Sequence, residues 1–114
     1  MMEIATSLPT VLDDIIVRLT RRMLIDRIYL FGSQATGNAY TDSDIDLLIV
    51  VPPSDLSRHT LETRCYDALW GLKTPVDLIV LTKSQFEHMS KAKTSIAATA
   101  MNKGIVLYER PQDG

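Results

Sequence analysis

The run DIDLLIVV at residues 44–51 places the strongest constraint on how this chain folds. Its apolar stretch is typical of a buried strand, and Pro52 and Pro53 directly after it end that strand. Successive side chains of a strand point to opposite faces, so Asp44 and Asp46 share one face while Ile45 lies on the other. The core must therefore accept a strand that carries two like charges at its beginning.

The remainder of the chain alternates helical and extended patterns. Apolar residues recur at helical spacing after Pro9, a good first-turn residue that Ser7 or Thr10 could cap, and Gly71 and Gly104 are typical helix stops. We expect helices at 9–22, 54–70, 84–89 and 91–103, a turn or short helix from 33, and strands at 27–31, 44–51, 76–82 and 105–109. This order predicts an α/β fold with a mixed central sheet of about four strands flanked by helices.

Composition limits the class of protein. A length of 114 residues fits one compact domain, residues 1–114, and 46% hydrophobic residues are enough for one core. The net charge of −2, with Lys and Arg spread along the chain, argues against direct nucleic-acid binding. The single cysteine, Cys65, excludes an internal disulfide and suits a reducing cytoplasm. With no membrane-spanning run and no signal peptide, we expect a cytoplasmic protein without a membrane partner.

The aspartates suggest a metal site. Two close carboxylates repel each other and resist desolvation, and a cation resolves this conflict. Asp77 also stands near the start of an apolar strand, and it would lie beside Asp46 if the two strands are neighbours. Three converging carboxylates suit two Mg²⁺ ions and displacement at phosphorus. The alternative is a solvated strand end formed by Asp42, Asp44 and Asp46, with Asp77 as a cap before its own strand.

The segment GSQATG at residues 32–37 favours anion binding. Gly32 and Ser33 directly follow a predicted strand and stand at the expected start of a helix. Backbone N–H groups there favour a phosphate, glycine permits its close approach, and the serine hydroxyl adds a donor. An ordinary Gly-Ser turn is the alternative, but a phosphate cradle about ten residues before a carboxylate pair favours the functional interpretation.

Other chemically notable residues are interpreted as structural. His59 and His88 have no partner at metal spacing and are expected to be solvated. Cys65 falls on an apolar helical stripe and is expected in the core. Tyr66 and Trp70 are expected to pack at a helix end, with contact to a base or a partner as the alternative.

Together these motifs resemble the polymerase-beta-like nucleotidyltransferase superfamily. Its signature is a hydrophobic residue with Gly-Ser, a spacer of about ten residues, and Asp-hydrophobic-Asp-hydrophobic; here these are Phe31-Gly32-Ser33 and residues 44–47. More narrowly, GSQATGNAYTDSDIDLLIV is similar to the minimal nucleotidyltransferases, the MNT proteins, whose loop often reads G-S-x-A-R-G. Thr36 departs from that pattern, because many relatives carry arginine there.

The resemblance implies the polymerase-beta-like fold and a function. Asp44 and Asp46 would bind both Mg²⁺ ions, Asp77 would bind the catalytic metal, and Gly32 and Ser33 would hold the triphosphate of ATP. In MNT proteins the partner is typically a HEPN-domain toxin, and the MNT antitoxin of the toxin–antitoxin pair transfers AMP to a tyrosine hydroxyl of that toxin (AMPylation). The resemblance therefore implies an ATP-using, magnesium-dependent adenylyltransferase.

Two other functions remain open from the sequence. The first is a non-catalytic antitoxin that neutralises its partner by covering a surface of that partner. Thr36 leaves this alternative open, because it stands where many relatives carry arginine. The second is a small-molecule nucleotidyltransferase of the aminoglycoside type, whose acceptor site would be built across a homodimer, one possible homo-oligomer.

Overall fold

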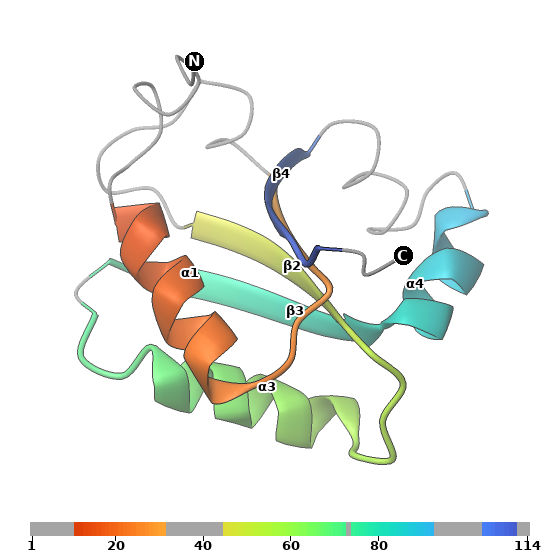
Figure 1. Cartoon of the computed structure of the whole chain (residues 1–114), viewed down its shortest axis with the longest axis horizontal. Helices are drawn as coiled ribbons and strands as arrows, with labels where there is room; N and C mark the ends of the chain where they lie inside the picture. Colours follow the sequence, from red (N-terminus) through yellow and green to blue (C-terminus); the bar gives the residue numbers. More distant parts are fainter. Residues whose placement is uncertain (1–10, 32–44, 73, 93–103, 112–114) are drawn as a thin grey trace.

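The computed structural model describes residues 11–31, 45–72, 74–92 and 104–111 of the chain (Figure 1). Its four strands form one sheet in the order β3-β2-β1-β4. β1 is antiparallel to both β2 and β4, whereas β2 and β3 are parallel, so the predicted mixed sheet is confirmed. The strand bounds are β1 Arg27–Phe31, β2 Ile45–Val51, β3 Val76–Thr82 and β4 Ile105–Glu109.

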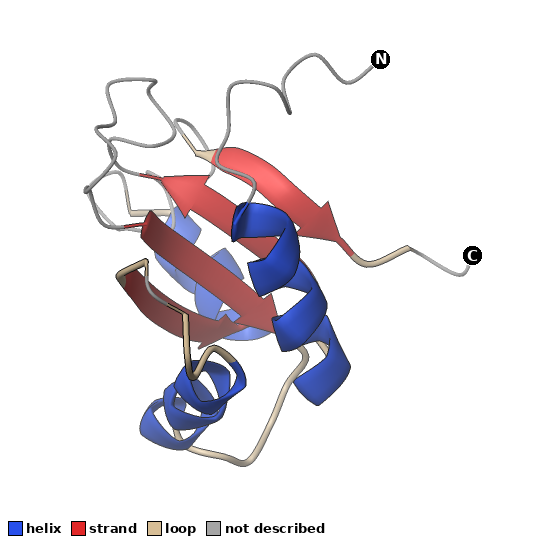
Figure 2. Cartoon of the chain, turned by 90° about the vertical axis from the view of Figure 1, so that its left-hand side faces the viewer, coloured by secondary structure: helices blue, strands red, loops and turns tan. Residues whose placement is uncertain are grey.

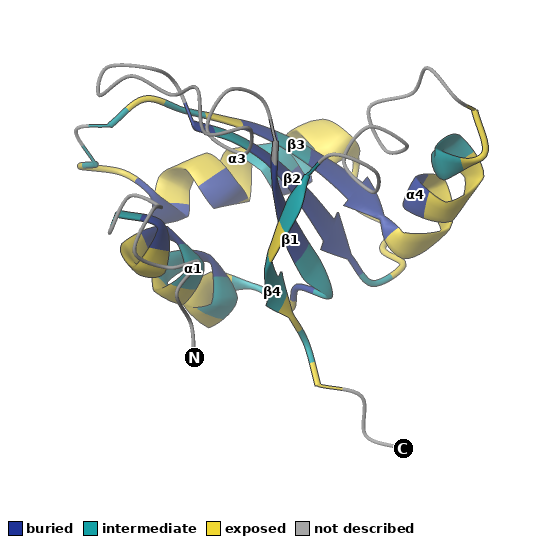
Figure 3. Cartoon of the chain, turned by 90° about the horizontal axis from the view of Figure 1, so that it is seen from above, coloured by how far each residue is buried: buried dark blue, intermediate teal, exposed yellow. Residues whose placement is uncertain are grey.

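Helices cover both faces of the sheet, which lies between them in Figure 2. α1 (Val11–Arg22) and α3 (Arg58–Ala68) pack on the face that carries Ile45, Leu47 and Ile49. α4 (Lys83–Ser90) packs on the other face, where its Phe86 joins a smaller apolar cluster. That cluster consists of Tyr29, Leu48, Val50, Leu81 and Phe86. The buried residues therefore form one large core and one small core on opposite faces (Figure 3).

The helix expected at 54–70 is shorter than predicted. α3 begins at Arg58, because the Ser57 hydroxyl accepts a hydrogen bond from the Thr60 N–H at 3.1 Å and caps the first turn. Before it, the Ser54 hydroxyl accepts from the Leu56 N–H at 3.1 Å and holds a turn instead of a helix. The apolar stripe was the right signal, but the hydroxyl groups determine where the helix starts.

The helices predicted at 9–22 and 84–89 are confirmed where the structure describes them. α1 buries Leu12, Ile15 and Leu19, and α4 begins one residue before and ends one residue after the predicted 84–89. Residues 9 and 10, the turn or helix predicted from 33, and residues 93–103 of the helix predicted at 91–103 lie outside the described residues. Lys91 and Ala92, predicted to begin that helix, instead form a turn. Within the described part, no helix has the length and apolarity required to cross a bilayer.

Candidate active site

Asp46 and Asp77 occupy matching positions on the two parallel strands. In the ladder between β2 and β3, Asp46 pairs directly with Asp77. Paired residues of neighbouring strands share a face and lie about 5 Å apart, so the two carboxylates stand side by side. The condition on which the predicted pair depended, that the two strands are neighbours, is therefore fulfilled. Asp46 is half-buried and Asp77 is exposed.

The burial pattern of the strands fixes this register. Ile45 and Leu47 flank Asp46 and are both buried on the opposite face, in the large core with Leu78. A slip of one residue would turn those side chains to the other face and bring a carboxylate into the core. The Ile45 N–H also donates to the Pro75 carbonyl at 3.0 Å, which starts the ladder one residue before the aspartates.

The last residue of β1 lies at the same end of the sheet's strands as Asp46 and Asp77. Phe31, the last residue of β1, pairs with Asp46. Gly32 follows Phe31 in the chain, and Asp44 precedes Ile45. Each is therefore bonded to a described residue at this end of the strands. Gly32, Ser33, Thr36 and Asp44 themselves lie outside the described residues. The predicted phosphate loop and the predicted metal ligand Asp44 therefore remain predictions.

The pair of carboxylates has the right chemistry for a magnesium ion. Mg²⁺ prefers hard oxygen ligands and is often bound by one or two carboxylates together with substrate phosphates. Asp46 and Asp77 supply such oxygens on one face of the sheet, so the residues present fit the ion. Among the described residues no group of three or more His, Cys, Asp or Glu side chains is placed to hold a metal, and the third predicted ligand is Asp44.

Two residues of α3 make hydrogen bonds with the strand that carries Asp77, and these bonds were not predicted from the sequence. Tyr66 and Glu62 of α3 accept hydrogen bonds from the backbone of β3, at 3.0 Å from the Leu78 N–H and 3.2 Å from the Val80 N–H. The only signal in the sequence is their position: each directly follows a residue of the buried stripe, Leu61 or Cys65. Tyr66 contacts the sheet through its hydroxyl, whereas Trp70, predicted to pack, is 84% exposed because it lies beyond the end of α3.

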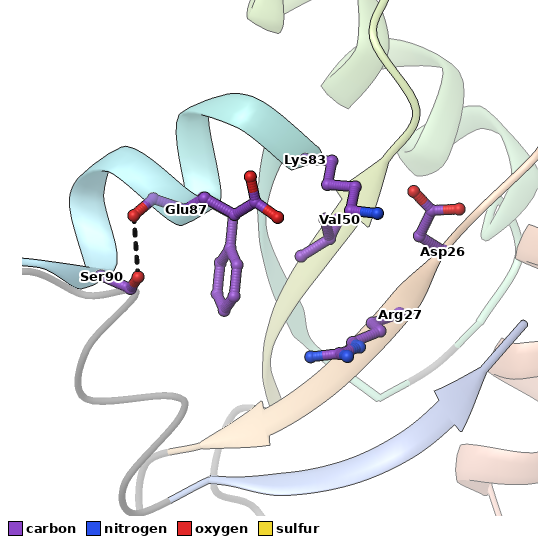
Figure 4. Close-up of a pocket in the computed structure, with 7 residues that line it drawn as sticks. Asp26, Arg27, Val50, Lys83, Glu87 and Ser90 are labelled. Carbon is purple, nitrogen blue, oxygen red and sulfur yellow. Dashed lines mark hydrogen bonds between the residues drawn. The ribbon is translucent and has the colours of Figure 1, made fainter.

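A separate pocket of about 210 Å³ lies on the same face at the opposite end of the strands. Figure 4 shows Asp26, just before β1, and Arg27, its first residue, across from Lys83 and Glu87 of α4, with Val50 between them. Asp46 and Asp77 are not among the residues that line it. The pocket is therefore distinct from the carboxylate pair.

The remaining predicted residues have structural environments. Cys65 is fully buried, and this burial raises the pKa of its thiol to about 12, with a smaller contribution from the Glu62 carboxylate. A thiol with such a pKa stays protonated and is a poor nucleophile at neutral pH. His59 and His88 are exposed on α3 and α4. The interpretation of all three as structural residues agrees with their surroundings.

A mixed sheet that pairs Asp46 with Asp77 on neighbouring parallel strands is the arrangement expected of a nucleotidyltransferase class of fold. Residues 13–113 match the family model described as polymerase beta, nucleotidyltransferase. The chain belongs to this family. The match spans nearly the whole chain and includes Asp46 and Asp77.

Solved structures support the same fold. A candidate nucleotidyltransferase from Sulfolobus solfataricus is 19% identical with a TM-score of 0.63, over 87% of this chain and 78% of that one. A toxin–antitoxin structure with AMP-PNP is 24% identical with a TM-score of 0.52, over 89% and 76% of the two chains. A variant of the toxin–antitoxin MntA-HpeT is 23% identical with a TM-score of 0.53, over 89% and 75%. A comparison with curated protein sequences gives no match.

Proposed function

We propose that residues 1–114 form a minimal nucleotidyltransferase domain that moves AMP from ATP to a hydroxyl group of a HEPN-type toxin, and so acts as a cytoplasmic antitoxin. The observation that carries this proposal is the direct pairing of Asp46 with Asp77 on one face of the sheet. Two of the neighbouring structures are toxin–antitoxin structures, and one of them holds AMP-PNP. Those neighbours support a toxin as the acceptor and an adenine nucleotide as the donor.

The proposed transfer of AMP requires the protein mainly to position the nucleotide, the acceptor hydroxyl and the metal ions. The acceptor oxygen, which we propose to be a tyrosine hydroxyl, attacks the α-phosphorus of ATP while the bond to pyrophosphate breaks. The hydroxyl proton leaves to a base, a role that suits the exposed Asp77. Bound magnesium would supply electrostatic stabilisation of the attacking and leaving oxygens. Asp44, Asp46 and Asp77 are the proposed ligands of two such ions, and Gly32 and Ser33 the proposed triphosphate site.

The test is transfer of label from α-labelled ATP to a HEPN-type toxin that binds this chain. Wild type is compared with the Asp46→Asn/Asp77→Asn double variant and with Asp67→Asn, which removes an exposed carboxylate from α3. We expect label on the toxin with wild type and Asp67→Asn, and a loss of at least about 100-fold with the double variant. Mass spectrometry of the labelled toxin then identifies the modified side chain.

Two other results would each replace the proposal. If no label is transferred while the double variant still neutralises the toxin in cells, the chain is a binding antitoxin. If the label appears on a small molecule instead of a protein, the aminoglycoside type of reaction is favoured. Label on the toxin at a residue other than tyrosine would retain the reaction and correct only the acceptor.

A further inference from the structure

The strand that carries Asp77 lies at an edge of the described sheet. β3 pairs with β2 on one side, and no strand in the described part pairs with its other side. The outward N–H groups of an edge strand lack ladder partners, so such a strand frays more readily than a central one. A metal ligand on an edge strand therefore requires additional support to keep its place.

Side chains provide that support along β3. Outward N–H groups recur at every second residue of a strand, and three successive ones donate to side-chain oxygens instead of to a neighbouring strand. The pairs are Leu78 N–H to Tyr66 Oη at 3.0 Å, Val80 N–H to Glu62 Oε2 at 3.2 Å, and Thr82 N–H to Gln85 Oε1 at 2.9 Å. These three acceptors replace the missing strand.

The contact of Tyr66 is the one closest to the carboxylate pair. The Leu78 N–H that it accepts belongs to the peptide unit joining Asp77 to Leu78, so the hydroxyl holds one side of the Asp77 backbone. The other side of β3 is held by the ladder that pairs Asp77 with Asp46. α3 is a firm support for Tyr66 because the adjacent Cys65 is fully buried in the large core.

We infer that Tyr66 is a positioning residue that keeps Asp77 in register beside Asp46 and thereby sets the affinity of the carboxylate pair for a divalent metal. This inference rests on the proposed function for the role of the metal. Without the hydroxyl, the first part of β3 opens more often, and binding the metal must restore its order. Tyr66 is 44% exposed, so water replaces part of the lost hydrogen bond and the effect is moderate.

The test compares Tyr66→Phe with Tyr108→Phe, which removes a tyrosine hydroxyl from β4 at the opposite edge of the sheet. We expect Tyr66→Phe to bind Mn²⁺, measured by electron paramagnetic resonance with AMP-PNP present, about three- to tenfold more weakly than wild type. Transfer at saturating metal recovers to near the wild-type rate, because the ligands themselves remain. Tyr108→Phe retains the wild-type affinity.

Amide hydrogen exchange provides a readout that requires neither metal nor activity. In the metal-free protein, Tyr66→Phe accelerates exchange of the Leu78 amide severalfold and leaves the Ile49 amide of the central strand unchanged. Glu62→Ala accelerates exchange at Val80 instead, two residues further from Asp77, and weakens Mn²⁺ binding less than Tyr66→Phe does. Glu62→Gln retains an acceptor oxygen and stays near wild type.

The outcomes separate the two proposals. If wild type binds no Mn²⁺ with nucleotide present, the proposed function fails, and the metal role of Tyr66 fails with it. If wild type binds Mn²⁺ and Tyr66→Phe binds it equally well despite faster exchange at Leu78, only the positioning role is overturned. Unchanged exchange at Leu78 would overturn the support of the strand itself.

Discussion

At the scale of single residues, the repulsion between the two paired aspartates bears directly on metal binding. Asp46 and Asp77 occupy directly paired positions, and like charges placed directly opposite each other destabilise a sheet. The protein tolerates this pair because Asp77 is exposed, so water screens its charge. A divalent cation would convert the repulsion into attraction, so metal binding should be measurable as stability.

We therefore predict that Mg²⁺ raises the melting temperature of the wild-type protein. A ligand at ten times its dissociation constant stabilises the folded state by about 1.4 kcal/mol, which corresponds to roughly 3–8 °C for a domain of this size. Asp77→Asn should show little or no such rise, and in metal-free buffer its free energy of unfolding should stay within about 0.5 kcal/mol of wild type. Differential scanning fluorimetry with and without Mg²⁺ measures both. A rise of equal size in wild type and Asp77→Asn would place the metal elsewhere.

The buried thiol of Cys65 makes the stability of the folded state depend on pH. Burial raises the pKa of its thiol from the ordinary 9.0 to about 12. Above pH 9 the unfolded chain loses this proton while the folded chain keeps it, so the folded state binds more protons and stability falls as the pH rises. The contribution is fully present below about pH 9 and is lost on the way to about pH 12.

We predict that the stability difference between wild type and Cys65→Ala shrinks above pH 9, by roughly 1.4 kcal/mol for each pH unit. Urea unfolding of both proteins at pH 7.5, 9 and 10.5 measures this, and the alanine variant serves as the control for all other groups that titrate there. In the native protein at pH 8, a thiol reagent should modify Cys65 far more slowly than in urea. A pH-independent difference between the two proteins would show that the thiol titrates equally in both states.

At the scale of elements, the short helix α3 both packs in the large core and accepts hydrogen bonds from β3. Leu61, Cys65 and Ala68 bury one side in the large core, while Glu62 and Tyr66 reach the backbone of β3. These two acceptors are four residues apart, which places them on the same face of the helix, next to the buried stripe. The start of α3 therefore matters for the edge strand as well as for the helix.

We predict that Ser57→Ala lowers the free energy of unfolding by about 1 kcal/mol, since the variant loses the cap on the Thr60 N–H. Thr63→Ala is the matched control, because it removes an exposed hydroxyl from the interior of the same helix, where alanine is the better helix former. Chemical denaturation of the two variants measures the difference. A loss of equal size in both would mean that the cap contributes nothing specific.

The elements also show what the sequence could and could not predict. All four strands were predicted because each is a compact apolar run. That Asp44 shares a face with Asp46 follows from the pleat and stays a prediction. The pairing of Asp46 with Asp77 was only conditional, since a sequence does not state which strands are neighbours. The support from Tyr66 was not predicted, because a hydrogen bond from a helix to a strand edge depends on how those elements pack.

At the scale of the whole molecule, the end of the sheet opposite the carboxylates is closed by contacts between distant parts of the chain. The Asp26 N–H donates to the Val50 carbonyl at 2.8 Å, and the Arg110 N–H donates to the Asp26 carbonyl at 2.9 Å. The Arg110 guanidinium also donates to Asp26 Oδ1 at 2.9 and 2.7 Å from its Nε and Nη2. Asp26 thus connects the beginning of β1 to the ends of both strands beside it.

We predict that this junction contributes more to stability than the ion pair next to it. Arg27 and Glu109 are 3.1 Å apart with side chains 42% and 52% exposed, whereas the Asp26 side chain is only 17% exposed and accepts two charged hydrogen bonds. Exposed pairs contribute little, so Glu109→Ala should cost less than about 0.5 kcal/mol. Arg110→Ala should cost about 1–2 kcal/mol, because it leaves a mostly buried carboxylate without its donors.

Urea denaturation at low salt and at 0.5 M NaCl distinguishes the two pairs. The small effect of Glu109→Ala should disappear in salt, which screens exposed charges, while most of the effect of Arg110→Ala should remain because the Asp26 carboxylate is shielded from solvent. Equal losses that both vanish in salt would instead make the junction an ordinary surface pair. The order of β4 would then depend on its ladder with β1 alone, and Arg110→Ala would leave amide exchange in β4 unchanged.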